Sequence, residues 1–147
     1  MKEISGFRGE YYYLSNFFPA VVPYNGFNWP TVENAFQAMK TLNPQERLEF
    51  LNLSPADAKK KGRSVKLRED WNEVKFQVMY EIVRAKFLAH PDLKAKLLAT
   101  GDAVIIEEND WGDIIWGVVQ GVGDNHMGQI LMRLRNEFRE EETNNVR

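Results

Sequence analysis

Helix-start signals recur through the middle of the chain, and they constrain the fold more than any other feature. An N-cap residue followed by proline, which is favoured in a first helical turn, occurs as Asn-Pro at 43–44 and as Ser-Pro at 54–55. These signals predict a short helix from 44 to about 52 and a second helix that stops at Gly62. We therefore expect the middle of the chain to be helical.

Longer helices are expected in the second half. Asp70 opens what should be the longest helix, whose apolar residues keep a helical spacing until the sequence HPD interrupts it at 90–92. A Leu-rich helix should follow to Leu98, and the spacing of apolar residues predicts a final amphipathic helix over 127–138.

Strands are expected to be few and short. The β-branched run AVIIE at 103–107 is the best strand candidate, and the first 30 residues are rich in aromatic residues, Pro and Gly. The fold class should be mainly α, that is, α+β with a few short strands. The 147 residues with 44% hydrophobic content suit one core, so we expect a single compact domain over 1–140 and a polar C-terminal tail over 141–147.

The low content of cysteine and histidine limits the kinds of catalytic and metal site that the chain can form. With no cysteine and two histidines, the chain offers no disulfide, thiolate metal site or cysteine nucleophile, and we expect neither a metal nor a cofactor. Both histidines, His90 and His126, are expected to cap helices or lie at the surface. No apolar run approaches the roughly 18 residues of a membrane span, and the first residues lack a signal-peptide pattern, so a cytoplasmic protein without a membrane partner is expected.

The stretch WPTVENAFQAMK at 29–40 places charged residues on one helix face. Thr31 is a good N-cap, and Glu33, Gln37 and Lys40 then follow at helical spacing. An acid in the first turn and a base in a later turn are ordinary helix stabilisation if this face meets water. If the face instead lines a cleft, the same pair can do chemistry, and the spacing alone leaves both interpretations open.

Three further features have a structural and a functional interpretation. The basic run KKKGRSVKLR at 59–68 could hold phosphates or be a solvated helix end, within a chain whose net charge is −2. Trp71 could anchor the core or stack on a base. The segment 110–128, with two Trp-Gly pairs and further glycines, could bring backbone amides to a ligand and lead into a helix N-terminus suited to phosphate.

A series of ordered motifs covers nearly the whole chain and together resembles the YbiA-like, or NADAR, family. They are LSNF at 14–17, WPTVENAFQAMK at 29–40, LREDW at 67–71, RAKF at 84–87, LLATGD at 97–102, and D-x-x-WG at 113–117 followed by G-x-N-x-x-G at 123–128 and LMRLR at 131–135. The resemblance implies a compact, mostly helical domain and an N-glycosidase that acts on ribose joined to a base-like nitrogen.

The resemblance also implies the site. Glu33 would stabilise an oxocarbenium-like ribose or activate water, and Lys40 would protonate the leaving base, bind phosphate or attack the anomeric carbon to give a Schiff base. The sequence does not choose among these roles. The implied catalytic residues are Glu33, Lys40 and Asp113, and the implied substrate-binding residues are Asn16, Phe17, Trp71, Lys86, Trp116, Gly123 and Asn125.

Three functions remain in competition at this point. The first is removal of ADP-ribose from guanine in nucleic acid, in an antitoxin-like pairing with a DarT-type ADP-ribosyltransferase. The second is cleavage of a riboflavin-pathway ribosylamino-pyrimidine phosphate, and the third is a non-catalytic ADP-ribose or nucleotide-binding module. The family often has His at the position of Asn34 and Leu at that of Met127, and we expect these departures to affect substrate preference more than activity.

Overall fold

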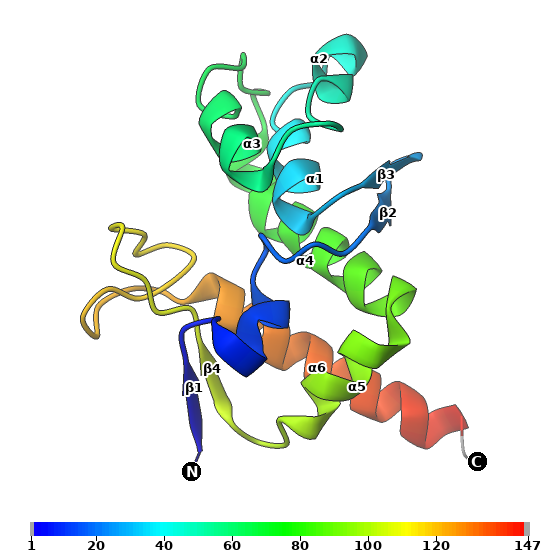
Figure 1. Cartoon of the computed structure of the whole chain (residues 1–147), viewed down its shortest axis with the longest axis vertical. Coiled ribbons are helices and arrows are strands. Elements are labelled where there is room, and N and C mark those ends of the chain that lie inside the picture. The colour runs from blue at the N-terminus through cyan, green and yellow to red at the C-terminus, as the bar shows by residue number, and fades with distance from the viewer. Residues whose placement is uncertain (1, 146–147) are drawn as a thin grey trace. The chain divides into compact units, whose positions relative to one another are not determined.

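The computed structural model describes residues 2–145, which form two compact units (Figure 1). The central unit is Asn16–Pro91, and the terminal unit combines the described residues from the two ends of the chain. The predicted class, mainly α with a few short strands, is confirmed. None of the helices between residues 2 and 145 combines the length and the apolar composition that a membrane span requires.

The central unit begins with a β-hairpin. Strands β2 (Val22–Tyr24) and β3 (Phe27–Trp29) pair antiparallel, and Asn25 and Gly26 turn the chain between them with φ of 52° and 86°. Asn-Gly suits a two-residue hairpin because both positions need a positive φ. The helices α1 (Val32–Ala38), α2 (Pro44–Leu48), α3 (Pro55–Lys61) and α4 (Trp71–Ala89) follow.

Three of the predicted caps are confirmed, with two corrections to helix length. Thr31, Asn43 and Ser54 each accept backbone N–H groups of the helix that they start. Helix α2 ends at Leu48 rather than near residue 52, and α1 ends at Ala38, so Lys40 lies in the turn after the helix. Side-chain caps and prolines specify where a helix starts, whereas its end depends on the tertiary contacts of the last turn.

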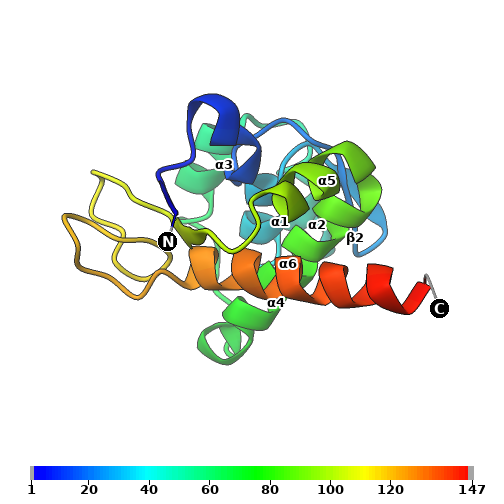
Figure 2. The same ribbon diagram turned by 90° about the horizontal axis from the view of Figure 1, so that it is seen from below.

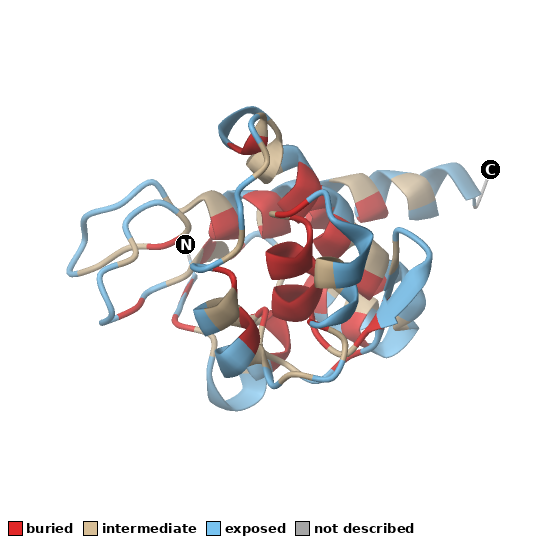
Figure 3. Ribbon diagram, turned by 90° about the horizontal axis from the view of Figure 1, so that it is seen from above, coloured by how far each residue is buried: buried red, intermediate tan, exposed pale blue. Residues whose placement is uncertain are grey.

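Helix α1 forms the core of the central unit. All seven of its residues are buried (Figure 3), and it packs against α2, α3 and α4. The fully buried Asn34 shows how a polar residue is tolerated there, because its side-chain amide donates to the carbonyls of Phe50 and Leu53, at 2.8 and 2.9 Å. Asn34 thereby fixes the α2–α3 connection to α1. These contacts give Asn34 a structural role, and its effect on substrate preference stays a prediction.

The terminal unit contains a parallel strand pair. Strand β1 (Glu3–Ser5) pairs with β4 (Val104–Ile106), which lies within the run predicted as a strand. A 3₁₀ helix (Gly9–Leu14) follows β1, and α5 (Pro91–Ala99) is the expected Leu-rich helix.

Helix α6 (His126–Asn145) completes the terminal unit (Figure 2). With 20 residues against 19 in α4, it is the longest described helix, which corrects the expectation that α4 would be. It packs against β4 at Gly128, where a Cβ would lie 2.1 Å from the Ile105 carbonyl oxygen. Helix α6 includes residues 141–145 of the expected tail, residues 146 and 147 lie outside the described residues, and the domain boundary at 140 stays a prediction.

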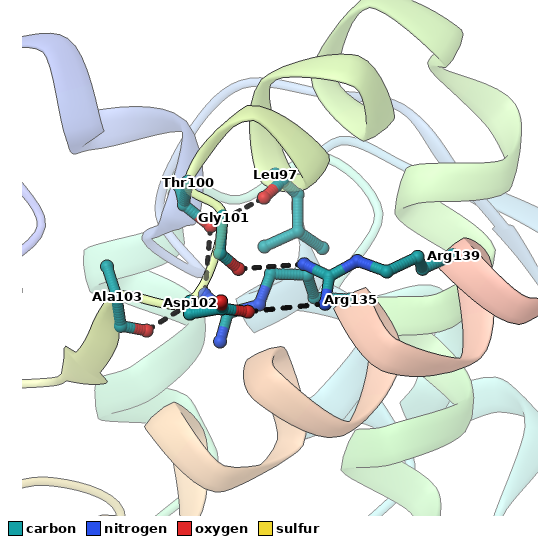
Figure 4. Close-up of polar contacts among 7 residues, drawn as sticks. All are labelled: Leu97, Thr100, Gly101, Asp102, Ala103, Arg135 and Arg139. Atoms are coloured by element: carbon teal, nitrogen blue, oxygen red, sulfur yellow. Dashed lines mark hydrogen bonds and ion pairs between the residues drawn. The ribbon is translucent and has the colours of Figure 1, made fainter.

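Two arginines of α6 bind the turn between α5 and β4 (Figure 4). The buried Arg135 donates to the Thr100 hydroxyl at 3.0 Å and to the Ala103 carbonyl at 2.9 Å. The exposed Arg139 donates to the Gly101 carbonyl at 2.8 Å and lies 3.4 Å from the Asp102 carboxylate. Because α6 is distant from this turn in sequence, these contacts help to hold the terminal unit together.

The first prediction compares these two arginines. Arg135→Met leaves the buried Ala103 carbonyl without this donor and should lower the free energy of unfolding by about 2 kcal/mol. Arg139→Met removes contacts that water can replace and should cost less than about 1 kcal/mol. Urea unfolding of both variants measures the two losses in free energy of unfolding. Equal losses would show that burial does not determine how much each arginine contributes to stability.

Candidate active site

The buried glutamate of α1 is the centre of the candidate site. Glu33 is 8% exposed, and its backbone N–H donates to the Asn16 carbonyl at 3.0 Å. One of its carboxylate oxygens, Oε2, accepts a 2.6 Å hydrogen bond from Nε2 of Gln37, one helical turn later. A buried carboxylate requires such donors because it has lost its hydration. The face of α1 that carries Glu33 is therefore not a solvated surface, and a catalytic role for Glu33 stays a prediction.

Lys40 lies close enough to Glu33 for the two charges to interact. Burial is the main cause that lowers the pKa of Lys40 below its ordinary value, and the Glu33 carboxylate partly offsets this effect. The nearby cations Arg63, Lys59 and Lys75 lower the pKa further. The structure thus brings together the two candidates of this motif, although Lys40 stands beyond the end of the helix.

Two cations of the basic run pair with nearby carboxylates. The Lys61 amine lies 3.7 Å from the Glu49 carboxylate. The Arg68 guanidinium forms a bidentate salt bridge with Asp70, in which Nε and Nη2 donate to the two carboxylate oxygens at 2.6 and 3.0 Å. Asp70, expected as the cap of α4, makes no side-chain capping bond to the helix. Of the run, Lys59 and Arg63 are the cations that act on Lys40.

The aromatic candidates of the central unit differ in exposure. Trp71 is 6% exposed, and its ring lies 5.0 Å from that of Phe36 between centroids, which is the contact of a core anchor. Phe17 is half-buried. A stacking role for either ring stays a prediction.

Asn16 and Lys86 are both buried. The Asn16 amide nitrogen lies 3.7 Å from the Met79 sulfur, so Asn16 contacts both α1 and α4. Lys86 is 1% exposed, and its amine lies 5.6 and 5.3 Å from the ring centroids of Phe18 and Phe87. Burial lowers the pKa of Lys86 from 10.5 to about 7. In this structure Lys86 is a buried amine among aromatic rings.

In the terminal unit, Asp113 and Asn125 organise the loop that precedes α6. The Asp113 carboxylate accepts the backbone N–H groups of Ile115 and Trp116, at 3.1 and 2.9 Å. The Asn125 side chain accepts from the Glu107 N–H at 3.0 Å and donates to the Ile105 carbonyl at 2.9 Å. Both side chains therefore build the loop, and their roles in catalysis and binding stay predictions.

Trp116 and Gly123 lie in the same loop. The half-buried Trp116 ring makes an edge-on contact with His126, at 6.3 Å between centroids. Gly123 has φ of 150°, and a Cβ there would lie 2.2 Å from the Gly117 carbonyl oxygen. The loop thus requires glycine at 123 for close packing of its own backbone, whichever ligand it meets.

Among residues 2–145, no three His, Asp or Glu side chains gather in a way that would hold a metal ion. The residue that sequence reasoning left out of the site is Gln37, whose hydrogen bond orients the Glu33 carboxylate. Its signal was the i, i+4 spacing from Glu33, which places the two side chains one above the other on a helix.

The second prediction concerns the buried amine of Lys86. Because its pKa is lower in the folded than in the unfolded chain, the unfolded state binds more protons between about pH 7 and 10, and stability should rise with pH through this window. Lys86→Met, which keeps the volume and removes the charge, should lack this rise. Urea midpoints of both proteins at about pH 7 and pH 9 test it. If the difference in urea midpoint between the two proteins is the same at both pH values, the lowered pKa of Lys86 is contradicted.

Comparison with known proteins places the chain in a family. Residues 6–139 match the NADAR domain. The chain is 41% identical over 129 residues to N-glycosidase YbiA of Escherichia coli (strain K12), covering 85% of this chain and 80% of that protein. It is 37% identical to a riboflavin biosynthesis protein of Vibrio vulnificus (strain YJ016), of which it covers 36%. The NMR structure of E. coli YbiA matches 97% of this chain and 88% of its own, with a TM-score of 0.88 and 38% identity. The chain belongs to the NADAR family.

Proposed function

We propose that this chain is an N-glycosidase that hydrolyses the bond between a ribose carbon and a base-type nitrogen. The observation that carries the proposal is the buried Glu33 carboxylate, oriented by Gln37 and electrostatically coupled to Lys40. The name of the E. coli relative, N-glycosidase, supports the same type of bond.

The proposed reaction develops charge on both sides of the bond that breaks. As the N-glycosidic bond breaks, positive charge develops on the ribose and negative charge on the leaving nitrogen. Glu33 stabilises the ribose cation or removes a proton from the attacking water. A carboxylate that is already fixed in a dry site acts more strongly than one in water, because the surroundings need not reorganise during the reaction.

Lys40 can protonate the leaving base as a cation, or it can attack the ribose as a neutral amine. A lowered pKa raises the fraction of neutral amine near neutral pH, and a neutral amine is a nucleophile. In this route the Lys40 nitrogen bonds to C1′ of the ribose, the bond from C1′ to the base breaks, and the base takes up one proton that the amine loses. The ribose ring oxygen then leaves C1′ and takes up the second amine proton, giving an imine that water hydrolyses to the released ribosyl product and the free amine.

Guanine-linked ADP-ribose in nucleic acid is our first candidate substrate. Lys59, Arg63 and Lys75, which lie near enough to act on Lys40, would attract a pyrophosphate and a nucleic-acid backbone. A DarT-type ADP-ribosyltransferase would be the matching partner, because it would form the bond that this chain removes.

A riboflavin-pathway ribosylamino-pyrimidine phosphate is the second candidate. It is favoured by the Vibrio relative, which is named a riboflavin biosynthesis protein. The two substrates share a ribose, a base-type nitrogen and phosphate, so Glu33 and the cations near Lys40 would serve either.

Incubation of the protein with each substrate separates the candidates. Release of ADP-ribose from guanine-modified DNA supports the first, and release of the pyrimidine supports the second. Binding of both without release from either would contradict the N-glycosidase proposal and favour a non-catalytic nucleotide-binding module.

The third prediction tests Glu33. Glu33→Gln keeps the size of the side chain and its contact with Gln37 but removes the negative charge, so turnover should fall by about 100-fold or more while the fold is retained. Glu73→Gln is the matched control, since Glu73 also stands in a first helical turn but is exposed. Initial rates and circular dichroism of both variants make the comparison. Near wild-type turnover in folded Glu33→Gln would remove Glu33 from the reaction.

The fourth prediction distinguishes the roles of Lys40. If its amine forms the imine, borohydride added during turnover should trap a stable adduct that maps to Lys40 by mass spectrometry. Lys40→Arg should then lose both turnover and trapping, because a guanidinium keeps its proton at any pH used for the assay and cannot act as a nucleophile. If Lys40→Arg keeps partial activity and the wild-type protein gives no adduct, Lys40 binds phosphate or protonates the leaving base. An adduct on Lys86 would assign the nucleophile to that buried amine.

A further inference from the structure

Gly62 stands at a position where the backbone does not need glycine. It caps the C-terminus of α3 with φ of −60° and ψ of −19°, which is ordinary right-handed helical conformation. At such a position alanine normally fits and stabilises the fold slightly, because it restricts the unfolded chain. Conformational freedom therefore does not explain a glycine here.

The Gln37 side chain occupies the space that a side chain at 62 would need. A Cβ on Gly62 would lie 1.9 Å from Oε1 of Gln37 and 2.7 Å from its Cδ. Gln37 is 5% exposed, and no hydrogen-bond donor in the described part of the chain reaches Oε1. Instead, Oε1 packs closely against the backbone of Gly62, which carries no side chain.

The Gln37 amide cannot move away from position 62 without releasing Glu33. Its Nε2 donates to Glu33 Oε2 at 2.6 Å, and Nε2 and Oε1 belong to one rigid planar group. A rotation that carried Oε1 away from a methyl group at 62 would therefore also carry Nε2 off the carboxylate. The surrounding residues of α1 are all buried, so the helix offers little room for another rotamer.

We propose that Gly62 is a positioning residue for Glu33 and acts through Gln37. Its missing side chain leaves the space that holds the Gln37 amide in place, and the amide in turn fixes the carboxylate. This inference rests on the proposed role of Glu33, but the packing that it describes does not.

A double-mutant cycle tests the packing without any substrate. Gly62→Ala should lower the unfolding midpoint by about 3 °C or more in the wild-type background. In the Gln37→Ala background, where the amide is absent, the same change should have almost no effect. If Gly62→Ala does not fold, recovery of the fold in the double variant supports the proposal. An equal effect of Gly62→Ala in both backgrounds, or failure of the double variant to recover, overturns it.

Steady-state rates test the positioning. Gly62→Ala should lower kcat by about ten-fold or more and change KM by less than about three-fold, because the proposed effect of Gly62 reaches the reaction through Gln37 and Glu33. In the Gln37→Ala background it should change kcat by less than about two-fold. Ser64→Ala, which removes a hydrogen bond to the Lys61 carbonyl at the same end of α3, is the control and should keep wild-type kcat.

The results separate the two proposals. A wild-type protein that releases no base from either substrate contradicts the proposed function, whereas the unfolding cycle still decides whether Gly62 holds Gln37. An active protein in which Gly62→Ala keeps wild-type kcat overturns the positioning role alone.

Discussion

The hydrogen bond from Gln37 to Glu33 is the interaction on which the proposed chemistry of the central unit depends. Both side chains are buried on one face of α1, and the helix is covered by its neighbours along its whole length. Burying a carboxylate without a donor would cost several kcal/mol, so the bond from Gln37 helps the fold to hold Glu33 there. The same bond fixes the direction of the carboxylate, which connects the stability of α1 to the geometry of the site.

Much of this arrangement could be predicted from the sequence because its signals are local. Caps at Thr31, Asn43 and Ser54 specify helix starts through hydrogen bonds that span two or three residues. The spacing of Glu33 and Lys40 indicated a shared face, although α1 ends before Lys40. The resemblance of the motifs indicated the family, because several ordered motifs carry more information than any single one.

The rest depends on contacts that are distant in sequence. Nothing near Asn34 reveals that it binds the carbonyls of Phe50 and Leu53, and nothing near Gly62 reveals that Gln37 fills its empty side. Asp70 looked like a cap, yet the neighbouring Arg68 takes its carboxylate. A short polar residue has several partners of similar strength, and the tertiary structure selects among them.

The most direct test of Glu33 as the catalytic carboxylate is a crystal structure of the Glu33→Gln variant with an uncleaved ribosyl substrate bound. The account predicts that C1′ of the ribose, or a water poised to attack it, lies about 3–3.5 Å from the side chain of residue 33, with the contact to Gln37 retained. A substrate bound with C1′ out of reach of residue 33 would contradict it.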